Sequence, residues 1–163
     1  MSDDTPWLSA DELQTWLHLA GVLTALPATI DAQLKRDACV NFFEYSILSG
    51  LSVRPGRAMQ MATLAQLANG SQSRLSHAVS RLEKAGWVER RHCPGDPRAV
   101  EAVLTDAGMA RVAQIAPAHV REVRRTVVDV LTAEELDQLR NACQKLLTVA
   151  APDVLEVIDE DRR

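Results

Sequence analysis

One amphipathic helix, expected from its N-cap at residue 71 to about residue 85, most constrains the fold of this chain. Ser71 is a favourable N-cap residue, and Gly86 is typical of the position just after a helix. At about 100° per residue, apolar and cationic side chains separate onto opposite faces. The apolar face holds Leu75, Ala78, Val79 and Leu82, and the opposite face holds Arg74, His77, Arg81 and Lys84, with Ser73 and Ser80 beside them. This helix must therefore bury one face in a core and leave its cations facing outward.

The periodicity changes to that of strands directly after this helix. Residues 87–92 and 99–104 are expected to be two strands joined by a turn over residues 93–98, where proline and glycine occur. The hairpin carries Arg90, Arg91, His92 and Arg98. A short buried helix is expected over residues 62–68, ended by Asn69 and Gly70, after a small strand over residues 58–61. Two short helices followed by a basic hairpin are typical of a winged helix-turn-helix.

Helical patterns also flank this central region. Ser9 and Glu12 form a capping box that opens a first helix, which Pro27 is expected to end or kink, so that residues 28–36 continue at an angle. A second cap at residues 41–44 starts the next helix. Residues 105–108 cap a long helix that Pro117 bends, residues 132–135 form another capping box, and the acidic tail after Pro152 is expected to fray. The predicted fold class is mainly α with a small β-wing.

The 163 residues are sufficient for one compact unit. We expect residues 1–40 to be an N-terminal dimerisation helix region, 41–104 a winged helix-turn-helix DNA-binding region, and 105–163 C-terminal dimerisation helices. The first helix and the last two carry long apolar stripes that one chain of this size does not cover by itself. A second copy related by a two-fold axis would bury them, which predicts a homodimer.

The distribution of charge, more than its total, indicates a nucleic-acid partner. The chain has a net charge of −4, but residues 54–98 contain eight cations and three anions and carry +5. The remaining residues contain ten cations and nineteen anions and carry −9. One face is therefore expected to attract phosphates while the rest of the surface repels them.

These segments together resemble the MarR (multiple antibiotic resistance regulator) family. The matching stretches are residues 41–45 (NFFEY), 64–68 (LAQLA), 73–86 (SRLSHAVSRLEKAG), 96–98 (DPR) and 103–108 (VLTDAG). Their order is specific as a set, and the flanking helices extend the resemblance over nearly the whole chain. The resemblance implies a triangular homodimer, a palindromic DNA operator, repression as the usual mode, and control by a small ligand or by oxidation.

The candidate DNA-binding residues lie on the central helix and the wing. The major groove of DNA admits a helix, and the first turns of such a helix contact base edges and phosphates. Arg98 near the wing tip is suited to the narrow minor groove. In the resembled family the wing aspartate and arginine occupy the places of Asp96 and Arg98, so Asp96 would orient an arginine. The DNA-binding candidates are Ser71, Gln72, Ser73, Arg74, His77, Arg81, Arg91 and Arg98.

An effector site is expected between the dimerisation helices and the winged region, where the resembled family binds ligands. Trp16, His18, Tyr45 and His119 are amphipathic side chains on helices expected to meet there. For each of them, ordinary packing or an exposed surface is the alternative interpretation and is the more common one for such residues. A small aromatic or anionic ligand at this place would act by favouring one separation of the two DNA-reading helices.

Redox control by cysteine is an alternative within the same fold. Cys93 follows His92 and lies among basic residues, which predicts a lowered thiol pKa, although adjacent strand residues point to opposite faces. Cys39 is expected in a turn, and Cys143 is expected to be buried. The three cysteines form no disulfide framework.

Other classes of protein are disfavoured. Phosphate-binding loops, Ser-His-Asp order, CxxC pairs and metal-like histidine spacing are absent, so no enzyme, cofactor or metal is expected. A winged helix that binds proteins in place of DNA is a second alternative, which the salt dependence of DNA binding would distinguish. No apolar run approaches the roughly 20 residues of a membrane span, and the N-terminus does not resemble a signal peptide, so a cytoplasmic location is expected.

Overall fold

The computed structural model describes residues 5–67, 71–93 and 95–160. The predicted mainly helical fold with a small β-wing is confirmed. The Asn69-Gly70 helix stop lies outside the described residues. The elements are α1 (Ala10–Ala38), α2 (Phe42–Ser52), a 3₁₀ turn η1 (Pro55–Arg57), β1 (Ala58–Gln60), α3 (Met61–Leu67), α4 (Gln72–Lys84), β2 (Val88–Cys93), β3 (Asp96–Leu104), α5 (Asp106–Thr126), a 3₁₀ turn η2 (Val128–Val130), α6 (Ala133–Ala150) and α7 (Pro152–Glu160).

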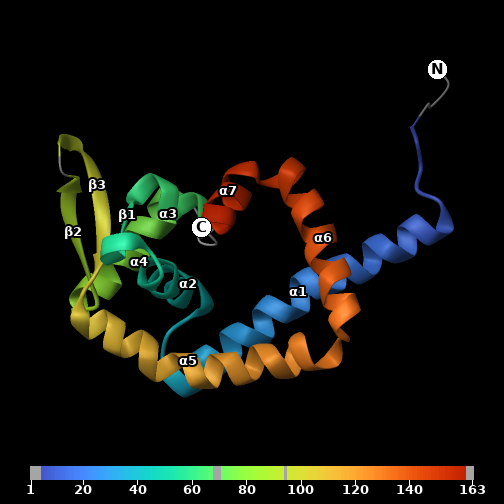
Figure 1. Ribbon diagram of the computed structural model, residues 1–163, viewed down its shortest axis with the longest axis horizontal. Helices are drawn as coiled ribbons and strands as arrows, with labels where there is room; N and C mark the ends of the chain where they lie inside the picture. Colours follow the sequence, from blue (N-terminus) through green and yellow to red (C-terminus); the bar gives the residue numbers. More distant parts are fainter. Residues whose placement is uncertain (1–4, 68–70, 94, 161–163) are drawn as a thin grey trace.

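The winged region forms around a three-stranded antiparallel sheet of order β1-β3-β2. β3 pairs with β1 through Met59 and Ala102 and with β2 through Arg91 and Glu101. Helices α2, α3 and α4 pack beside the sheet, and the long β2–β3 hairpin projects at one end of the molecule (Figure 1). The core of this region comprises Phe43, Ile47, Leu48, Leu51, Met59, Leu64, Ala65, Leu75, Ala78, Val79, Leu82, Val88, Ala102, Leu104 and Val112.

The helix starts follow the predicted local patterns. Each of α1, α2 and α6 begins with a complete capping box, in which the N-cap side chain accepts from the N3 amide and a glutamate accepts from the N-cap amide. Thr105 caps α5 by accepting from the amide of Gly108 at 2.9 Å. These local bonds satisfy free amides at the helix ends, so the positions of the starts depend on only a few neighbouring residues.

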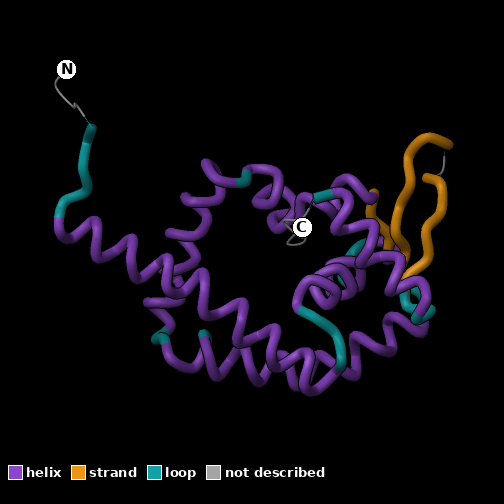
Figure 2. The backbone as a smooth tube through the Cα atoms, turned by 180° about the vertical axis from the view of Figure 1, so that it is seen from behind, coloured by secondary structure: helices purple, strands orange, loops and turns teal. Residues whose placement is uncertain are grey.

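Helices α1 and α5 lie side by side and connect the winged region to the rest of the chain. A second apolar cluster, containing Ile30, Leu34, Tyr45 and Ile115, joins α1, α2 and α5. From the wing, α5 leads to α6, and α7 returns to α3, so these helices trace an arc that begins and ends at the winged region (Figures 1 and 2). The proposed region boundaries at residues 40/41 and 104/105 stay a prediction.

Pro27 does not end the first helix, because α1 is one helix of 29 residues. Proline removes an amide donor for the carbonyl four residues earlier, here that of Leu23. Both Leu23 and Pro27 lie on the exposed side of the helix, where water can bind that carbonyl. Ile30 and Leu34 are buried on the other side, and their packing keeps the helix continuous. Helix α5 likewise runs through Pro117.

The expected fraying after Pro152 is also wrong within the described residues. Helix α7 packs on α3, and Val157 is 8% exposed. The guanidinium of Arg54 donates to the carbonyl oxygen of Val157 at 2.9 Å, and the amide of Gln66 donates to the Asp153 carboxylate at 2.9 Å. The partners are 103 positions apart in the first contact and 87 positions apart in the second, so a local sequence pattern does not reveal them.

Candidate nucleic-acid interface

Helix α4 is held in the core by one face and presents its N-terminal turn outward. Leu75, Ala78, Val79 and Leu82 are all at most 2% exposed, as the periodicity predicted. The hydroxyl of Ser71 accepts from the amide of Arg74 at 3.2 Å, which confirms the predicted N-cap. The exposed residues of the outer face are Ser71, Gln72, Ser73, Arg74, Ser76, His77, Arg81 and Lys84.

Two arginines of α4 are positioned by residues at the start of α2. The guanidinium carbon of Arg74 lies 4.2 Å from the centre of the Phe43 ring, a cation–π geometry. The Nε of Arg81 donates to the Glu44 carboxylate at 2.6 Å, and the second oxygen of that carboxylate accepts from the amide of Asn41. Glu44 therefore caps α2 and holds an arginine of α4 at the same time.

Arg90 on β2 fixes the wing to α4. Its guanidinium donates to the Glu83 carboxylate at 2.6 Å, to the Ser76 carbonyl at 2.7 Å and to the Ser80 hydroxyl at 3.1 Å. Its main-chain amide donates to the other carboxylate oxygen of Glu83 at 3.0 Å. Both side chains of the ion pair are less than a third exposed. We name this group, formed by Arg90, Glu83, Ser76 and Ser80, the wing latch.

The hairpin itself is tighter than expected. Its strands reach Cys93 and Asp96, so the predicted turn over residues 93–98 is wrong, and a bulge between His92 and Cys93 shifts the register there. Arg91 faces away from the latch and pairs with Glu101 across the strands at 2.6 Å. Arg98 is exposed and lies within β3, close to the tip.

Asp96 orients main chain, in contrast to the expectation that it orients an arginine side chain. Its carboxylate accepts from the amide of Arg98 at 2.9 Å, and within the described residues it forms no ion pair. This i to i+2 bond fixes the backbone at the start of β3. Asp96 therefore influences the position of Arg98 through its main-chain amide and not through its guanidinium.

The wing and α5 meet at a close backbone contact. The amide of Thr105 donates to the Trp87 carbonyl at 3.1 Å, and the Thr105 hydroxyl donates to the Gly86 carbonyl at 2.7 Å. A Cβ on Gly108 would overlap the Trp87 carbonyl oxygen and would lie 2.7 Å from Leu104 Cδ1. Only glycine fits at this position, so the start of α5 is placed directly against the start of the wing.

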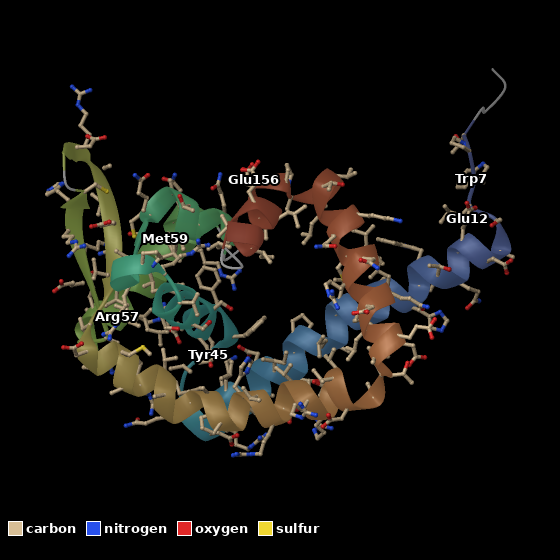
Figure 3. The ribbon with its side chains drawn as sticks, in the orientation of Figure 1. Trp7, Glu12, Tyr45, Arg57, Met59 and Glu156 are labelled. Atoms are coloured by element: carbon tan, nitrogen blue, oxygen red, sulfur yellow. The ribbon has the colours of Figure 1, made fainter. Side chains whose placement is uncertain are left out.

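The four residues proposed for an effector site do not come together. The rings of Tyr45 and His119 are 4.6 Å apart between α2 and α5, and burial raises the pKa of Tyr45 and lowers the pKa of His119. His18 bonds the Gln14 carbonyl and Trp16 is 54% exposed, both on the outer part of α1. Figure 3 shows Glu12, one turn before Trp16, at the far end of α1 from Tyr45.

A cavity of about 890 Å³ instead lies between α1, α2 and α4. Phe42 and Phe43 of α2 and Pro27 and Ala28 of α1 give it apolar walls. Its polar lining comes from Asp31 and Lys35 of α1, from Asn41 and Ser46, and from Arg74, His77 and Arg81 of α4. Three DNA-binding candidates therefore line a cavity that sequence reasoning did not find, because its walls come from separate helices.

Cysteine chemistry differs from the sequence prediction. The pKa of the Cys93 thiol is raised by partial burial and by the carboxylates of Glu101 and Asp96, which outweigh the opposite effect of Arg91. The expectation of a lowered pKa is therefore wrong. Cys143 was expected to be buried, but it is exposed, because within one protomer no other element covers the face of α6 that carries it.

We expect Cys93 to react slowly with alkylating reagents at neutral pH. In a Cys39→Ser, Cys143→Ser background, the rate of iodoacetamide alkylation should rise with pH. The midpoint of this rise should lie above about pH 8.5, which is the pKa of a free cysteine thiol. The reason is that a raised pKa leaves less thiolate at pH 7. A midpoint below pH 8 would contradict this expectation and return Cys93 to the candidates for a redox sensor.

Two kinds of site are absent from the part of the chain that the structure describes. No three His, Cys, Asp or Glu side chains are grouped as metal ligands are. None of the helices in residues 5–67, 71–93 and 95–160 is long and apolar enough to cross a membrane.

Comparison with known proteins places this geometry in a family. A profile of the MarR family matches residues 43–100. The structure of Sco3205, a MarR family transcriptional regulator from Streptomyces coelicolor in complex with DNA, is 41% identical, covers 89% of this chain and 91% of its own, and superposes with a TM-score of 0.83. AbsC, a MarR family transcriptional regulator from the same organism, is 35% identical, with coverages of 88% and 97% and a TM-score of 0.82. The chain belongs to the MarR family of transcriptional regulators.

Two further relatives match this chain over less than two thirds of their own length. The HTH-type transcriptional regulator PecS of Dickeya dadantii (strain 3937) is 38% identical over 68 residues, which are 42% of this chain and 40% of PecS. The transcriptional repressor MprA of Escherichia coli (strain K12) is 26% identical over 109 residues, which are 67% of this chain and 61% of MprA. The family profile and the two solved relatives confirm the predicted resemblance to the MarR family.

Within this MarR family fold, the structure separates the candidate residues into two groups. Ser71, Gln72, Ser73, Arg74 and His77 are exposed on one end of α4, and Arg98 is exposed on the wing. Arg81 and Arg91 are bound in ion pairs with Glu44 and Glu101. Sequence reasoning missed Arg90, Glu83, Glu44 and Phe43 as partners. The one sequence signal for the different roles of Arg90 and Arg91 is that adjacent residues of a strand point to opposite faces.

Proposed function

We propose that this MarR family chain binds a palindromic DNA operator as a homodimer and represses transcription. Helix α4 enters the major groove and the β2–β3 wing contacts the adjacent minor groove. The proposal assigns no catalytic activity to the chain and places it in the cytoplasm. The proposal is supported by the similarity to Sco3205, which is 41% identical to this chain and whose structure was solved in complex with DNA.

The observation that carries the proposal is the orientation of α4. Its apolar face is fully buried, so the N-terminal turn with Ser71, Gln72 and Ser73 points outward together with Arg74 and His77. Free amides at a helix start bind phosphate, and arginine pairs with guanine in a bidentate manner. Because Arg81 and Arg91 are already paired with carboxylates, we assign them to phosphate contacts or positioning and assign base reading to Arg74.

Exposed apolar side chains support the homodimer. Val149 near the end of α6 is 86% exposed, and seven more large hydrophobic residues of α1 and α6 are 43–61% exposed. They are Leu13, Trp16, Leu17, Val22, Leu23, Leu139 and Leu146. A symmetric pairing through these helices buries them and holds two copies of α4 about 34 Å apart, one turn of B-DNA.

Binding to DNA from upstream of the chain's own gene tests the proposal. We expect one dimer to bind that duplex more tightly than random DNA of equal length, with an affinity that falls steeply as salt rises. Fluorescence anisotropy across a salt series, with sedimentation to fix the stoichiometry, measures both. Equal binding to both duplexes at every salt concentration, or no binding, would favour a winged helix that binds a protein partner.

Arg74→Ala tests the assigned base contact. We expect about a tenfold or larger loss of affinity for the operator, with a smaller loss for random DNA, because a bidentate contact to guanine contributes about 1–3 kcal/mol of discrimination. Arg121→Ala, at an exposed arginine in the last two turns of α5, is the control and should bind like wild type. An equal loss on both duplexes would mean that Arg74 contacts a phosphate only.

A further inference from the structure

Helix α7 leaves α6 through a short and well-bonded joint. Only Ala151 separates the end of α6 from the start of α7. Its amide donates to the Leu147 carbonyl at 2.9 Å, and its carbonyl accepts from the amides of Val154 at 3.1 Å and Leu155 at 3.3 Å. These bonds tie the joint to both helices, so α7 has a fixed direction relative to α6.

The other contacts of α7 bind it to the winged region. Val157 is 8% exposed where α7 packs on α3. The Arg54 guanidinium, just after α2, donates at 2.9 Å to the Val157 carbonyl in the last turn of α7, where the helix dipole favours a cation. Near the start of α7, the Asp153 carboxylate accepts from the Gln66 amide of α3 at 2.9 Å. Both ends of α7 are therefore bound to the winged region.

The winged region is consequently held at two places. Helix α5 meets it at the Gly108 contact and along α2, and α7 meets it at α3, on the opposite side in Figure 1. A body that is held at one place can rotate about that place, whereas a second support removes this rotation. Helix α3 packs on α4. The direction of α4 therefore depends on α7 as well as on α5.

We propose that α7 fixes the separation and direction of the two α4 helices in the homodimer, and thereby selects operators by the spacing of their half-sites. This inference rests on the proposed function, in which α1 and α6 pair with a second copy. Each α7 then connects the dimer interface directly to the helix-turn-helix through α3. Arg54, Gln66 and Val157 are positioning residues, because they hold α7 and are not among the candidates for DNA contact.

Half-site spacing is a strict requirement for a dimer whose α4 helices cannot move. Each base pair inserted between two half-sites moves one of them by about 3.4 Å and rotates it by about 35° around the DNA axis. A dimer with fixed α4 helices then binds through one of them and loses the gain from bivalent binding. A dimer whose winged regions rotate freely recovers part of that gain.

The first measurement compares duplexes that differ in spacing, by fluorescence anisotropy. The probes are the palindromic operator identified by footprinting upstream of the chain's own gene, the same duplex with one or two base pairs inserted at its centre, and a duplex with one half-site. We expect wild type to prefer the natural spacing by about tenfold or more, and Val157→Asp and Arg54→Met to prefer it by about threefold or less. All three proteins should bind the single half-site equally, because the surface of α4 is unchanged.

Ile158→Asp is the matched control. It introduces the same carboxylate at the next position of α7, where the side chain is 42% exposed, and should keep the wild-type spacing preference. Circular dichroism and sedimentation select the variants that are folded and dimeric, and Arg54→Met decides if Val157→Asp does not fold. An unchanged spacing preference in Arg54→Met would overturn the proposal. An equal loss of affinity for every duplex would also overturn it, because α7 would then stabilise the fold without fixing the spacing.

The second measurement is the distance between the two α4 helices in the dimer without DNA, by pulsed electron paramagnetic resonance. A spin label is attached at Lys84→Cys, an exposed position at the end of α4, in a background with serine at all three native cysteines. We expect one narrow distance distribution in this background and with Ile158→Asp, and a broad distribution with Arg54→Met. Equally narrow distributions in all three would overturn the proposal. Broadening by Arg54→Met in a protein that binds no operator would overturn the proposed function and leave the role of α7 intact.

Discussion

Gly108→Ala should lower the free energy of unfolding by about 3 kcal/mol, in the upper part of the range for overpacked positions. A Cβ at this position overlaps the Trp87 carbonyl oxygen, which is main chain and also accepts the Thr105 amide. The start of α5 must therefore move away from the wing, and that hydrogen bond is lost. Chemical denaturation followed by circular dichroism measures the change.

Gly50→Ala is the matched control for this substitution. Gly50 lies within α2, and a Cβ there meets no atom within 4 Å. Alanine favours a helix over glycine, so we expect this variant to be more stable by about 0.5–1 kcal/mol. If Gly108→Ala were as stable as Gly50→Ala, the close contact between α5 and the wing would not exist in solution.

Arg90→Leu should lower the free energy of unfolding by about 2 kcal/mol and weaken operator binding. The substitution removes three side-chain bonds of the wing latch and leaves the half-buried Glu83 carboxylate without its cation. Breaking a buried ion pair costs more than forming it gains, because the remaining charge stays desolvated. The wing then loses its fixed position beside α4, so Arg98 reaches the minor groove less often.

Arg57→Leu is the control. Arg57 and Asp106 form an ion pair outside the latch, with side chains 42% and 101% exposed, and pairs of this kind contribute about 0–1 kcal/mol. Urea denaturation measures stability, and anisotropy measures operator affinity at fixed salt. Equal loss of stability in the two variants would show that the latch does not join wing and helix, whatever the DNA affinities.

The wing latch and the glycine contact together explain how a small sheet can be part of a DNA-reading surface. Arg90 joins the side of β2 to α4, and Gly108 allows the end of the hairpin to touch α5. Helix α5 in turn packs along α1. When the two winged regions of a dimer change their relative position, α4 and the wing of each region therefore move together as one body.

The sequence alone predicted the parts of the site that depend on near neighbours. The separation of Leu75, Ala78, Val79 and Leu82 from the cations of α4 follows from helical spacing, and it is confirmed. The three capping boxes and the N-cap at Ser71 are confirmed for the same reason, since each involves residues three positions apart. The hairpin was placed correctly, although its turn was predicted too long.

Only the tertiary structure decided which side chains meet across elements. Glu44 and Arg81 are 37 positions apart, and Arg54 reaches Val157 over 103 positions. Pairings of this kind depend on how helices pack, and so does the cavity beside Arg74. Packing also overrode local rules, because α1 continues through Pro27 where Ile30 is buried, and α7 forms a helix that packs on α3. The sequence determined the winged helix-turn-helix and its cationic helix, because helix periods and caps are short-range. The partners of those cations were decided by packing, which acts between residues that are distant along the chain.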